Sequence, residues 1–503
     1  MLNMTSTTGS CVRLPSIRLT CLALSSVLLG QVSFPGNTTY TSSLESYFSL
    51  QEAAVHPDCI VSPQTAQDVS TVVRILTSTH ERPGSLSSPT CCQFAIRSGG
   101  HAISAGAANI AGGVTIDLSG LSKITLSSVA EGTAPTVSAG VGSTWGAVYD
   151  YLDGLGLGVN GGRVAGIGVG GLTLGGGISY FGPRFGWTCD NVVNFEVVLA
   201  NGTLINANDA ENPDLLWALR GGANNFGVVT RVDLQTFPQG DLWGGQVIRP
   251  FETAEAQMTA LAAFNDPEAY DEFASLITTF AYSGDEDLQF VVNNIEYTKP
   301  VANPPIFHSL TSMPALSSTQ RITNMSDLAA ESASGYPDGF RQATATLTIA
   351  SSVEAINATV LAWNASIASV RAIQGILWSV NMDPLPPQLY AKYATANSLG
   401  LTNRKGRSLI ILDMSIRWSD AEDDGAVEEA VAALITNIER DVGELDALDP
   451  FLYSNYAAAW QQPIIGYGED SVERLQRVQS VYDPERVFTV LVPGGFKISD
   501  GLK

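Results

Sequence analysis

The residues with the clearest chemical potential lie in glycine-dense stretches. The first stretch is Arg97-Ser98-Gly99-Gly100-His101, which follows an apolar run that predicts a strand. Consecutive glycines after a strand allow a sharp turn that aims several N–H groups at one point, an arrangement suited to pyrophosphate. Arg97 fits either a phosphate partner or an anchor of the loop. His101 is one of four histidines in the chain, and it is either a reactive group or a loop histidine bonded to a carbonyl.

A second stretch, Gly161–Gly177, must be tested against the dinucleotide-binding fingerprint. Gly166, Gly168 and Gly171 satisfy G-x-G-x-x-G. That motif requires a buried strand immediately before it, whereas Leu155–Arg163 is itself rich in glycine. A Rossmann fold is therefore disfavoured, and close approach of the backbone to a flat, extended cofactor explains the glycines better. A third stretch, Arg220–Val229, follows a predicted helix and again pairs a bend with an apolar strand.

The elements that must position these stretches change in character near Pro238. Before it, short β-branched runs alternate with helical patterns, and Asn201-Gly202 predicts a hairpin turn. The strands predicted there are Cys59–Val61, Phe94–Arg97, Val114–Leu118, Thr136–Ala139 and Val192–Leu199, and the helix is Pro63–Leu76, capped by Thr65 or Asp68. After Pro238, glycine becomes less frequent and long amphipathic segments appear at Thr253–Phe264, Ala355–Ile373 and Asp424–Val442, beside strands at Phe290–Val292, Ala343–Ile349 and Leu409–Ile416. This pattern predicts an α+β lobe with an antiparallel sheet covered on one side by helices.

Length and charge exclude several classes of protein. The chain has 503 residues, 45% of them hydrophobic and 15% charged, so we expect more than one lobe and exclude a disordered or coiled-coil chain. Its net charge of −23 repels phosphate backbones, which excludes nucleic acid as a partner. The histidines show no spacing of a paired ligand set, so we expect no metal centre. A hydrolase is disfavoured because no G-x-S-x-G elbow occurs.

Residues 1–30 are expected to form a secretory signal peptide. Arg13 and Arg18 supply positive charge, Leu19–Leu29 is an apolar run too short to span a bilayer, and no acidic residue precedes Glu45. An uncleaved anchor or a disordered leader is the alternative. No later stretch has transmembrane length, so we expect a secreted protein that has no membrane contact once the leader is removed.

The cysteines and sequons are consistent with export. Cys11 and Cys21 would leave with the leader, which leaves Cys59, Cys91, Cys92 and Cys189. Cys59 opens one predicted strand and Cys92 lies just before another, which favours a Cys59–Cys92 disulfide, and four reduced, buried thiols are the alternative. In a secreted chain, N-x-S/T sequons become glycosylation sites; they occur at Asn37, Asn201, Asn324, Asn357 and Asn364.

Seven segments, in chain order, resemble one family of flavoproteins. They are Arg97–His101 (RSGGH), Val169–Gly177 (VGGLTLGGG), Asp190-Asn191, Asn212–Gly222 (NPDLLWALRGG), Asn225–Val229 (NFGVV), Tyr453–Tyr456 (YSNY) and Arg474–Phe488, which ends in YDPERVF. These segments are similar to the berberine-bridge-enzyme-like oxidoreductases of the vanillyl-alcohol-oxidase superfamily. The resemblance implies a two-lobed α+β fold with a PCMH-type FAD-binding domain at residues 55–238, a substrate domain at 239–450 and a C-terminal segment, 451–503, that returns to the FAD domain.

The resemblance also assigns the cofactor and the residues that hold it. In this family the histidine of the RSGGH motif bonds to the 8α-methyl of FAD, and here it is His101. The second attachment cysteine of many relatives corresponds to Val164, so we expect a single covalent link. The residues expected to bind the cofactor are Arg97, Ser98, Gly99, Gly100, His101, Gly140, Val141, Gly168, Gly170, Gly171, Gly175, Gly176, Tyr180, Val229 and Asn455.

The expected reaction is removal of a hydride from an alcohol, an amine or a small natural product. By the resemblance, Tyr453 is the base and Asp383 is the acidic residue that hydrogen-bonds to it; packing and turn formation are their alternative roles. Oxygen is the expected electron acceptor, although Ile167 is bulky where oxidases carry a small residue, which leaves a dehydrogenase open. The alternative function is a flavin-binding protein or a non-redox cyclase that keeps the fold without oxidative turnover.

Overall fold

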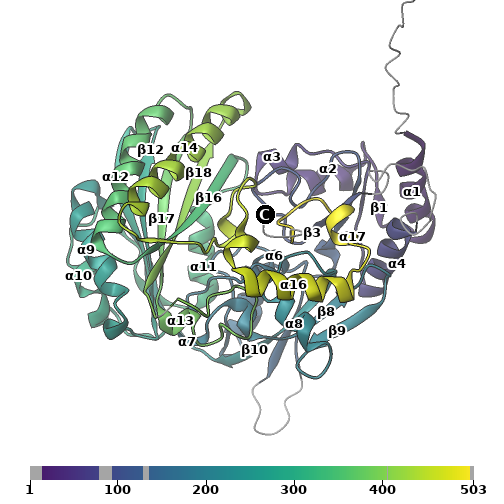
Figure 1. The fold of residues 1–503 in the computed structure, drawn as a ribbon, viewed down its shortest axis with the longest axis horizontal. Helices are drawn as coiled ribbons and strands as arrows, with labels where there is room; N and C mark the ends of the chain where they lie inside the picture. The colour runs from purple at the N-terminus through teal and green to yellow at the C-terminus, as the bar shows by residue number, and fades with distance from the viewer. Residues whose placement is uncertain (1–13, 79–92, 128–134, 405, 499–503) are drawn as a thin grey trace, which may run out of the picture.

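The chain folds into two lobes with mixed helices and strands, as expected for an α+β protein. The computed structural model describes residues 14–78, 93–127, 135–404 and 406–498. In Figure 1 the N-terminal part of the chain, purple to teal, forms the lobe on the right, and the following part, teal to yellow-green, forms the lobe on the left. The glycine-rich stretches of the sequence lie in the right-hand lobe, where several of their residues line a cavity shared with the other lobe.

The first sheet of the right-hand lobe carries the RSGGH loop at the end of a strand. It has the order β1 (Val32–Ser33), β2 (Cys59–Val61), β4 (Val114–Asp117) and β3 (Phe94–Arg97), in which β2, β4 and β3 are parallel. Helix α4 (Ala66–Thr77) connects β2 to β3 and begins with a capping box between Thr65 and Asp68. Its apolar face is buried, which confirms the helix predicted over 63–76.

The second sheet of this lobe is antiparallel and supplies the wall behind the glycine stretches. Its order is β5 (Ile124–Leu126), β6 (Thr136–Gly140), β10 (Val228–Pro238), β8 (Val192–Val198) and β9 (Leu204–Asn208), with β7 (Leu157–Val159) also paired to β10. The predicted hairpin at Asn201-Gly202 is confirmed, and Gly202 has the positive φ (78°) that such a turn requires. Around this sheet lie α5 (Trp145–Asp153), α6 (Val169–Leu174), α7 (Gly182–Phe185) and α8 (Pro213–Leu219).

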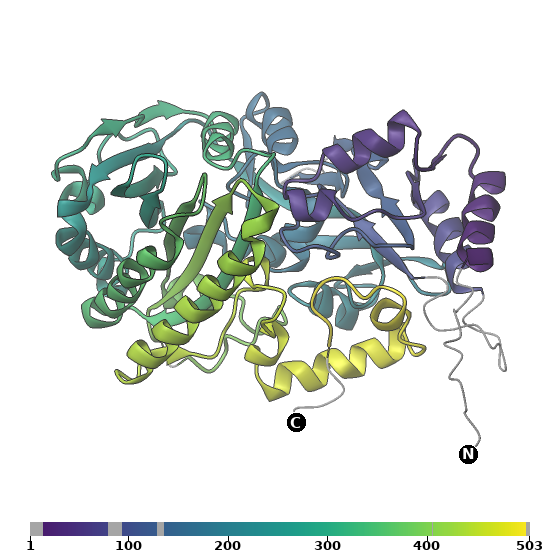
Figure 2. The same cartoon turned by 90° about the horizontal axis from the view of Figure 1, so that it is seen from above.

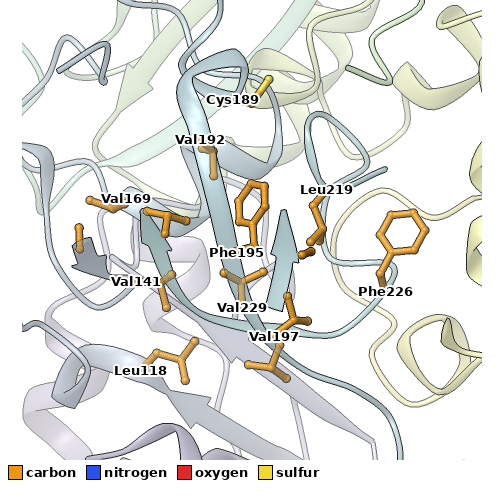
Figure 3. Packing of buried hydrophobic residues seen from close by; sticks show 14 of the residues in the cluster. Leu118, Val141, Val169, Cys189, Val192, Phe195, Val197, Leu219, Phe226 and Val229 are labelled. Carbon is orange, nitrogen blue, oxygen red and sulfur yellow. The ribbon is translucent and has the colours of Figure 1, made fainter. Parts of the chain in front are cut away.

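A continuous apolar core joins these elements. Figure 3 shows Val192, Phe195 and Val197 of β8 packed with Val229 of β10, with Leu219 and Phe226 beside them. All six side chains are nearly or fully buried. The glycine-rich loops therefore start from rigid strands, which is how a loop holds a fixed geometry.

The left-hand lobe is built on a large antiparallel sheet. Its order is β14 (Ser317–Ser318), β11 (Leu242–Pro250), β13 (Leu288–Tyr297), β12 (Ala274–Ser283), β17 (Leu377–Leu385), β18 (Leu409–Trp418), β16 (Arg341–Ala350) and β19 (Leu448–Asp449), with β15 (Arg321–Thr323) paired to β11. Helices α9 (Ala254–Phe264), α12 (Val353–Val370) and α14 (Asp424–Gly443) pack on it and bury their apolar faces. The predicted antiparallel sheet with covering helices is confirmed. Shorter helices are α10 (His308–Thr311), α11 (Met325–Ser334) and α13 (Pro387–Tyr390).

The C-terminal segment crosses back to the right-hand lobe. It contains α15 (Pro463–Gly466), α16 (Glu469–Tyr482) and α17 (Val487–Val490), drawn in yellow in Figures 1 and 2. The backbone N–H of Phe94 in β3 donates to the carbonyl of Leu491 (2.8 Å). The side chain of Asn225 donates to the carbonyl of Phe496 (2.9 Å). The end of the chain thus supports the strand that carries the RSGGH loop.

The predicted Cys59–Cys92 disulfide is wrong. Cys59 is bonded to Cys21, which lies in helix α1 (Leu14–Val27), whereas Cys91 and Cys92 lie outside the described residues. Cys21 and Leu24 are buried in the core of the first lobe, where α1 packs against α4 and β1. The prediction failed because it discarded Cys21 together with the expected leader. None of the helices in the described part of the chain combines the length and hydropathy needed to cross a bilayer.

Candidate functional site

A cavity of about 600 Å³ lies at the junction of the two lobes. The sequence-predicted residues that line it are Ser98, Gly99, Gly100, His101, Val141, Gly168, Gly170, Gly171, Gly175, Tyr180, Val229, Asp383, Tyr453 and Asn455. Arg97, Gly140 and Gly176 do not line it. The structure therefore brings together the two glycine motifs, the YSNY segment and strands of the second lobe around one space large enough for a cofactor and a small ligand.

Two of the glycine loops cross in contact with each other. A Cβ atom added to Gly168 would lie 2.5 Å from the backbone nitrogen of Gly99, and one added to Gly99 would lie 2.4 Å from the Cα of Gly168. Both positions therefore require glycine. Ser98 stabilises this contact between the loops. Its hydroxyl donates a hydrogen bond to the carbonyl of Val141 (2.5 Å) and accepts one from the N–H of Gly170 (3.3 Å).

Arg97 anchors the RSGGH loop from behind the cavity. Its guanidinium donates to the carbonyl of Ser46 (3.0 Å), also bonds the carbonyl of Ser43, and lies 3.7 Å from the carboxylate of Asp117. The ring of Tyr47 lies 4.0 Å from the guanidinium carbon. Of the two roles left open for Arg97 by its sequence, these contacts favour the anchor over the phosphate partner.

His101 projects into the cavity as a neutral imidazole. Burial lowers the pKa of His101 to about 4, so the ring is unprotonated at neutral pH. Its ring stacks on that of Phe48, with 3.9 Å between the centroids and 16° between the planes. Within the described residues, neither ring nitrogen of His101 has a hydrogen-bond partner. An unprotonated, unbonded imidazole nitrogen is a nucleophile.

Tyr453 has its hydroxyl engaged by the backbone. The oxygen accepts the N–H groups of Gly177 and Ile178, each at 3.1 Å, and the side-chain amide of Asn455 at 2.9 Å. Burial raises the pKa of Tyr453. The structure records no hydrogen bond between Tyr453 and Asp383, so it does not form the pair that the sequence suggested.

Asp383 instead forms a three-membered cluster with Arg163 and Tyr456. The guanidinium of Arg163 donates to both carboxylate oxygens, at 2.5 and 3.3 Å, and to the hydroxyl of Tyr456 at 2.5 Å. The hydroxyl of Tyr456 in turn donates to Asp383 (3.2 Å). Burial raises the pKa of Tyr456, and the positive charge of Arg163 opposes that rise. The cluster joins the lobes, because Arg163 comes from the first and Asp383 from β17 of the second.

Strands of the second lobe add polar side chains to the lining of the cavity. Asp413 in β18 accepts hydrogen bonds from Asn381 (2.9 Å) and Thr344 (2.8 Å). Burial raises the pKa of Asp413 to about 6, against the effect of these two hydrogen bonds. Tyr180 closes the side wall, where its hydroxyl pairs with that of Ser332 in α11 (3.0 Å). The space beside the glycine loops thus offers acceptors suited to hydroxyl or amino groups.

Sequence reasoning missed Arg163, Tyr456, Asp413 and Phe48. Tyr456 lies in the quoted YSNY segment, but spacing cannot decide which of its two tyrosines points at an acid. Asp413 lies in an otherwise apolar strand. A single carboxylate in such a strand indicates a functional role, and this signal could have identified Asp413 from the sequence. For Phe48 no signal exists in the sequence, because its contact with His101 depends on the path of a loop.

Comparison with known proteins settles the class of cofactor. Residues 57–208 match the model of a family described as "FAD binding domain". The chain is 36% identical, over 490 residues, to the FAD-dependent monooxygenase sdcF of Emericella nidulans, a match that covers 95% of this chain and 98% of that protein. The chain therefore belongs to a family of FAD-binding oxidoreductases whose named members include FAD-dependent monooxygenases. A protein of Diaporthe leptostromiformis named oligopeptidase PhomG' is 40% identical over 93% of this chain, which spans only 36% of that longer relative.

Solved structures of berberine-bridge-enzyme-like proteins share the fold. The moss protein "Physcomitrella patens BBE-like 1" superposes with a TM-score of 0.74 at 18% identity and covers 96% of this chain and 100% of its own. A glucooligosaccharide oxidase from Acremonium strictum, described with a "6-s-cysteinyl, 8 alpha-N1-histidyl FAD", gives a TM-score of 0.72 at 18% identity and covers 94% of this chain and 97% of its own. At these identities the likeness establishes the architecture alone.

The residues of the cavity fit FAD. Glycines of both crossed loops line the cavity, so the backbone can approach a pyrophosphate there with no side chain in between. Val141 and Val229 give apolar walls to the same space. FAD, when bound to such a family member, supplies the two-electron chemistry.

Proposed function

We propose that this oxidoreductase removes a hydride from a small molecule and passes it to an FAD that is bonded to the chain at His101 alone. The observation that carries the proposal is the shared cavity. An unprotonated His101 lines it together with the cluster of Arg163, Asp383 and Tyr456. The same space thus holds a point of attachment and a group that can take a proton.

The single covalent link is supported by the residues at the two attachment positions. His101 supplies a neutral imidazole, as the histidyl link named for the Acremonium oxidase requires. Val164 lines the cavity where the second, cysteinyl link would need a thiol. For the attachment, His101 would supply the imidazole nitrogen that bonds to the 8α-methyl carbon, and one proton would leave each partner. FAD would take up the two electrons released, and dioxygen would be their final acceptor, giving hydrogen peroxide.

Tyr456 and Asp383 are the groups best suited to accept the proton that the substrate loses. Because its pKa is raised, the phenol of Tyr456 stays protonated at neutral pH and cannot act as a base by itself. The hydrogen bond from Tyr456 to Asp383 removes that difficulty, because the tyrosine can pass its own proton to the carboxylate while it accepts one from the substrate. Arg163 orients both groups and balances the charge of the carboxylate. Tyr453 then serves to hold the turn at Gly177.

The proposed substrate is an alcohol, an amine or a small natural product with hydroxyl groups. The lining of the cavity offers the carboxylate of Asp413 and the amide of Asn381 to such groups. Oxygen is the proposed electron acceptor. A second candidate function, insertion of an oxygen atom into the substrate, is favoured by the name of sdcF, a monooxygenase.

Anaerobic addition of a panel of alcohols, amines and phenols, with the flavin absorbance recorded, tests the function. Bleaching by one class identifies the substrate, and readmission of air with peroxide measurement tests oxygen as the acceptor. Isotopically labelled oxygen appearing in the product would instead indicate a monooxygenase. Absence of bleaching by every class, with FAD bound, would contradict oxidative turnover and favour a binding protein or a cyclase.

We also propose that the protein is exported. The Cys21–Cys59 disulfide supports this, because such bonds persist in oxidising compartments. Cleavage after residue 30 would remove Cys21, so a leader of that length and this disulfide exclude each other. N-terminal sequencing of protein from the culture medium distinguishes the two: a start near residue 31 supports the leader, and a start before Cys21 supports the disulfide.

A further inference from the structure

Three consecutive residues of one N-terminal segment each contact the loop that carries His101. The segment Tyr47–Ser49 lies between α2 (Thr38–Glu45) and α3 (Leu50–Ala53). The hydroxyl of Tyr47 donates to the carbonyl of Ala108 (2.9 Å), and that of Ser49 donates to the carbonyl of Ile103 (2.8 Å). Between them, the backbone N–H of Phe48 donates to the carbonyl of Gly100 (3.0 Å). Phe48 is thereby fixed directly beside His101.

The ring of Phe48 makes the contact that orients the imidazole. The two rings are stacked, with centroids 3.9 Å apart and planes inclined by 16°. Phe48 itself is only 5% exposed, so its own position is set by packing. In the described part of the chain no hydrogen bond reaches either nitrogen of His101, and the aromatic contact therefore replaces the usual polar partner.

We infer that Phe48 is a positioning residue for the covalent attachment of flavin at His101. This inference rests on the attachment proposed above. A hydrogen bond donated to the unprotonated nitrogen would orient the ring but would also occupy the lone pair that forms the new bond. A stacked ring restricts rotation through the π face and leaves free the lone pair of the unprotonated nitrogen, which lies in the ring plane. Orientation of this kind raises the rate of bond formation because fewer unproductive geometries are sampled.

The segment is also fastened to the substrate lobe. The N–H of Leu50 donates to the carbonyl of Phe340 (3.0 Å). The side chain of Gln51 exchanges two hydrogen bonds with the backbone of Gln342, at 2.8 and 3.0 Å. Phe48 is therefore held in place from both lobes.

The test measures covalent incorporation, without any substrate. Full-length protein from flavin-limited cells is incubated with FAD, and the flavin that stays with the chain after denaturation is followed over time. The variants are Phe48→Leu, Phe48→Met and Phe48→Tyr, with His101→Ala as the negative control. Phe307→Leu is the matched control, because Phe307 is equally buried but lies in the core of the other lobe.

We expect Phe48→Leu and Phe48→Met to slow attachment about tenfold, because the oriented geometry is lost. Phe48→Tyr should keep the rate of the natural protein, since the aromatic face remains. Phe307→Leu should lower the thermal midpoint without slowing attachment, which separates positioning from general destabilisation. Attachment at the natural rate in Phe48→Leu or Phe48→Met, or equal slowing in Phe48→Tyr, would overturn the inference. Fully dissociable flavin in the natural protein would instead overturn the proposed covalent link.

Discussion

Two tyrosines three residues apart have different partners and therefore different expected roles. Tyr456 touches Asp383 and Arg163, whereas Tyr453 accepts hydrogen bonds from the backbone at Gly177 and Ile178. Tyr456→Phe should lower kcat by about 10²- to 10⁴-fold, the range for loss of a general base, with the flavin content unchanged. Steady-state kinetics and flavin absorbance check this.

Tyr453→Phe is the matched comparison for that variant. It leaves buried N–H groups without an acceptor and should lower the free energy of unfolding by about 1–3 kcal/mol while most turnover remains. Denaturant unfolding measures the loss. The reverse result, in which Tyr453→Phe abolishes turnover and Tyr456→Phe retains it, would show that the sequence-based choice of Tyr453 as the base was right.

The lowered pKa of His101 predicts how flavin attachment depends on pH. An ordinary histidine has a pKa near 6.5, but burial brings the pKa of His101 to about 4. As the pH falls through 6.5, the imidazole in the folded protein therefore stays neutral and nucleophilic. The rate of attachment should be constant between about pH 8 and pH 5. A rate that falls with a midpoint near pH 6.5, measured by flavin retained after denaturation, would contradict the burial of this group.

At the scale of the loops, the crossing of Gly99 and Gly168 is the critical contact. Gly168→Ala would place a methyl group 2.5 Å from the backbone nitrogen of Gly99, so the two loops must separate. The variant should fold but lose bound FAD. Gly166→Ala, in the same stretch, would meet no atom within 4 Å and should bind FAD normally. Flavin absorbance of the purified proteins distinguishes them, and FAD bound equally by both would contradict the role of the crossing.

The elements were predictable from sequence to different degrees. Helix α4 and the hairpin at Asn201-Gly202 follow from local signals, a capping box and a turn dipeptide, so both were predicted close to their observed bounds. The crossing of Gly99 with Gly168 joins residues far apart in the chain. The glycine content indicated that another group approaches the backbone closely there, but it could not indicate which segment of the chain does so. The segment Tyr47–Ser49 has no periodicity at all, which is why its contact with His101 was not foreseen.

At the scale of the whole molecule, the site exists only where the lobes meet. The sequence resemblance supplied the two-lobed α+β architecture and placed Asp383 and the YSNY segment near the flavin. It could not supply the partner of Asp383, because Arg163 comes from the other lobe. Contacts between lobes depend on side-chain direction across an interface, and no local pattern encodes that.

The N-terminal helix offers a test of the global assembly. Loss of the Cys21–Cys59 bond by Cys21→Ser should lower the free energy of unfolding by about 2–5 kcal/mol, the usual range for a native disulfide. Reductant should lower the thermal midpoint of the natural protein and leave that of the variant unchanged. A natural protein that is insensitive to reductant and yields no Cys21–Cys59 linked peptide would contradict the docking of α1.

The proposed function depends on a covalent bond between FAD and His101. Peptide mapping by mass spectrometry of freshly purified, denatured protein tests it most directly. A flavin adduct is expected on the peptide that contains His101 and on no other peptide, with no flavin in the supernatant. An unmodified His101 peptide, with all the flavin released or attached elsewhere, would contradict it.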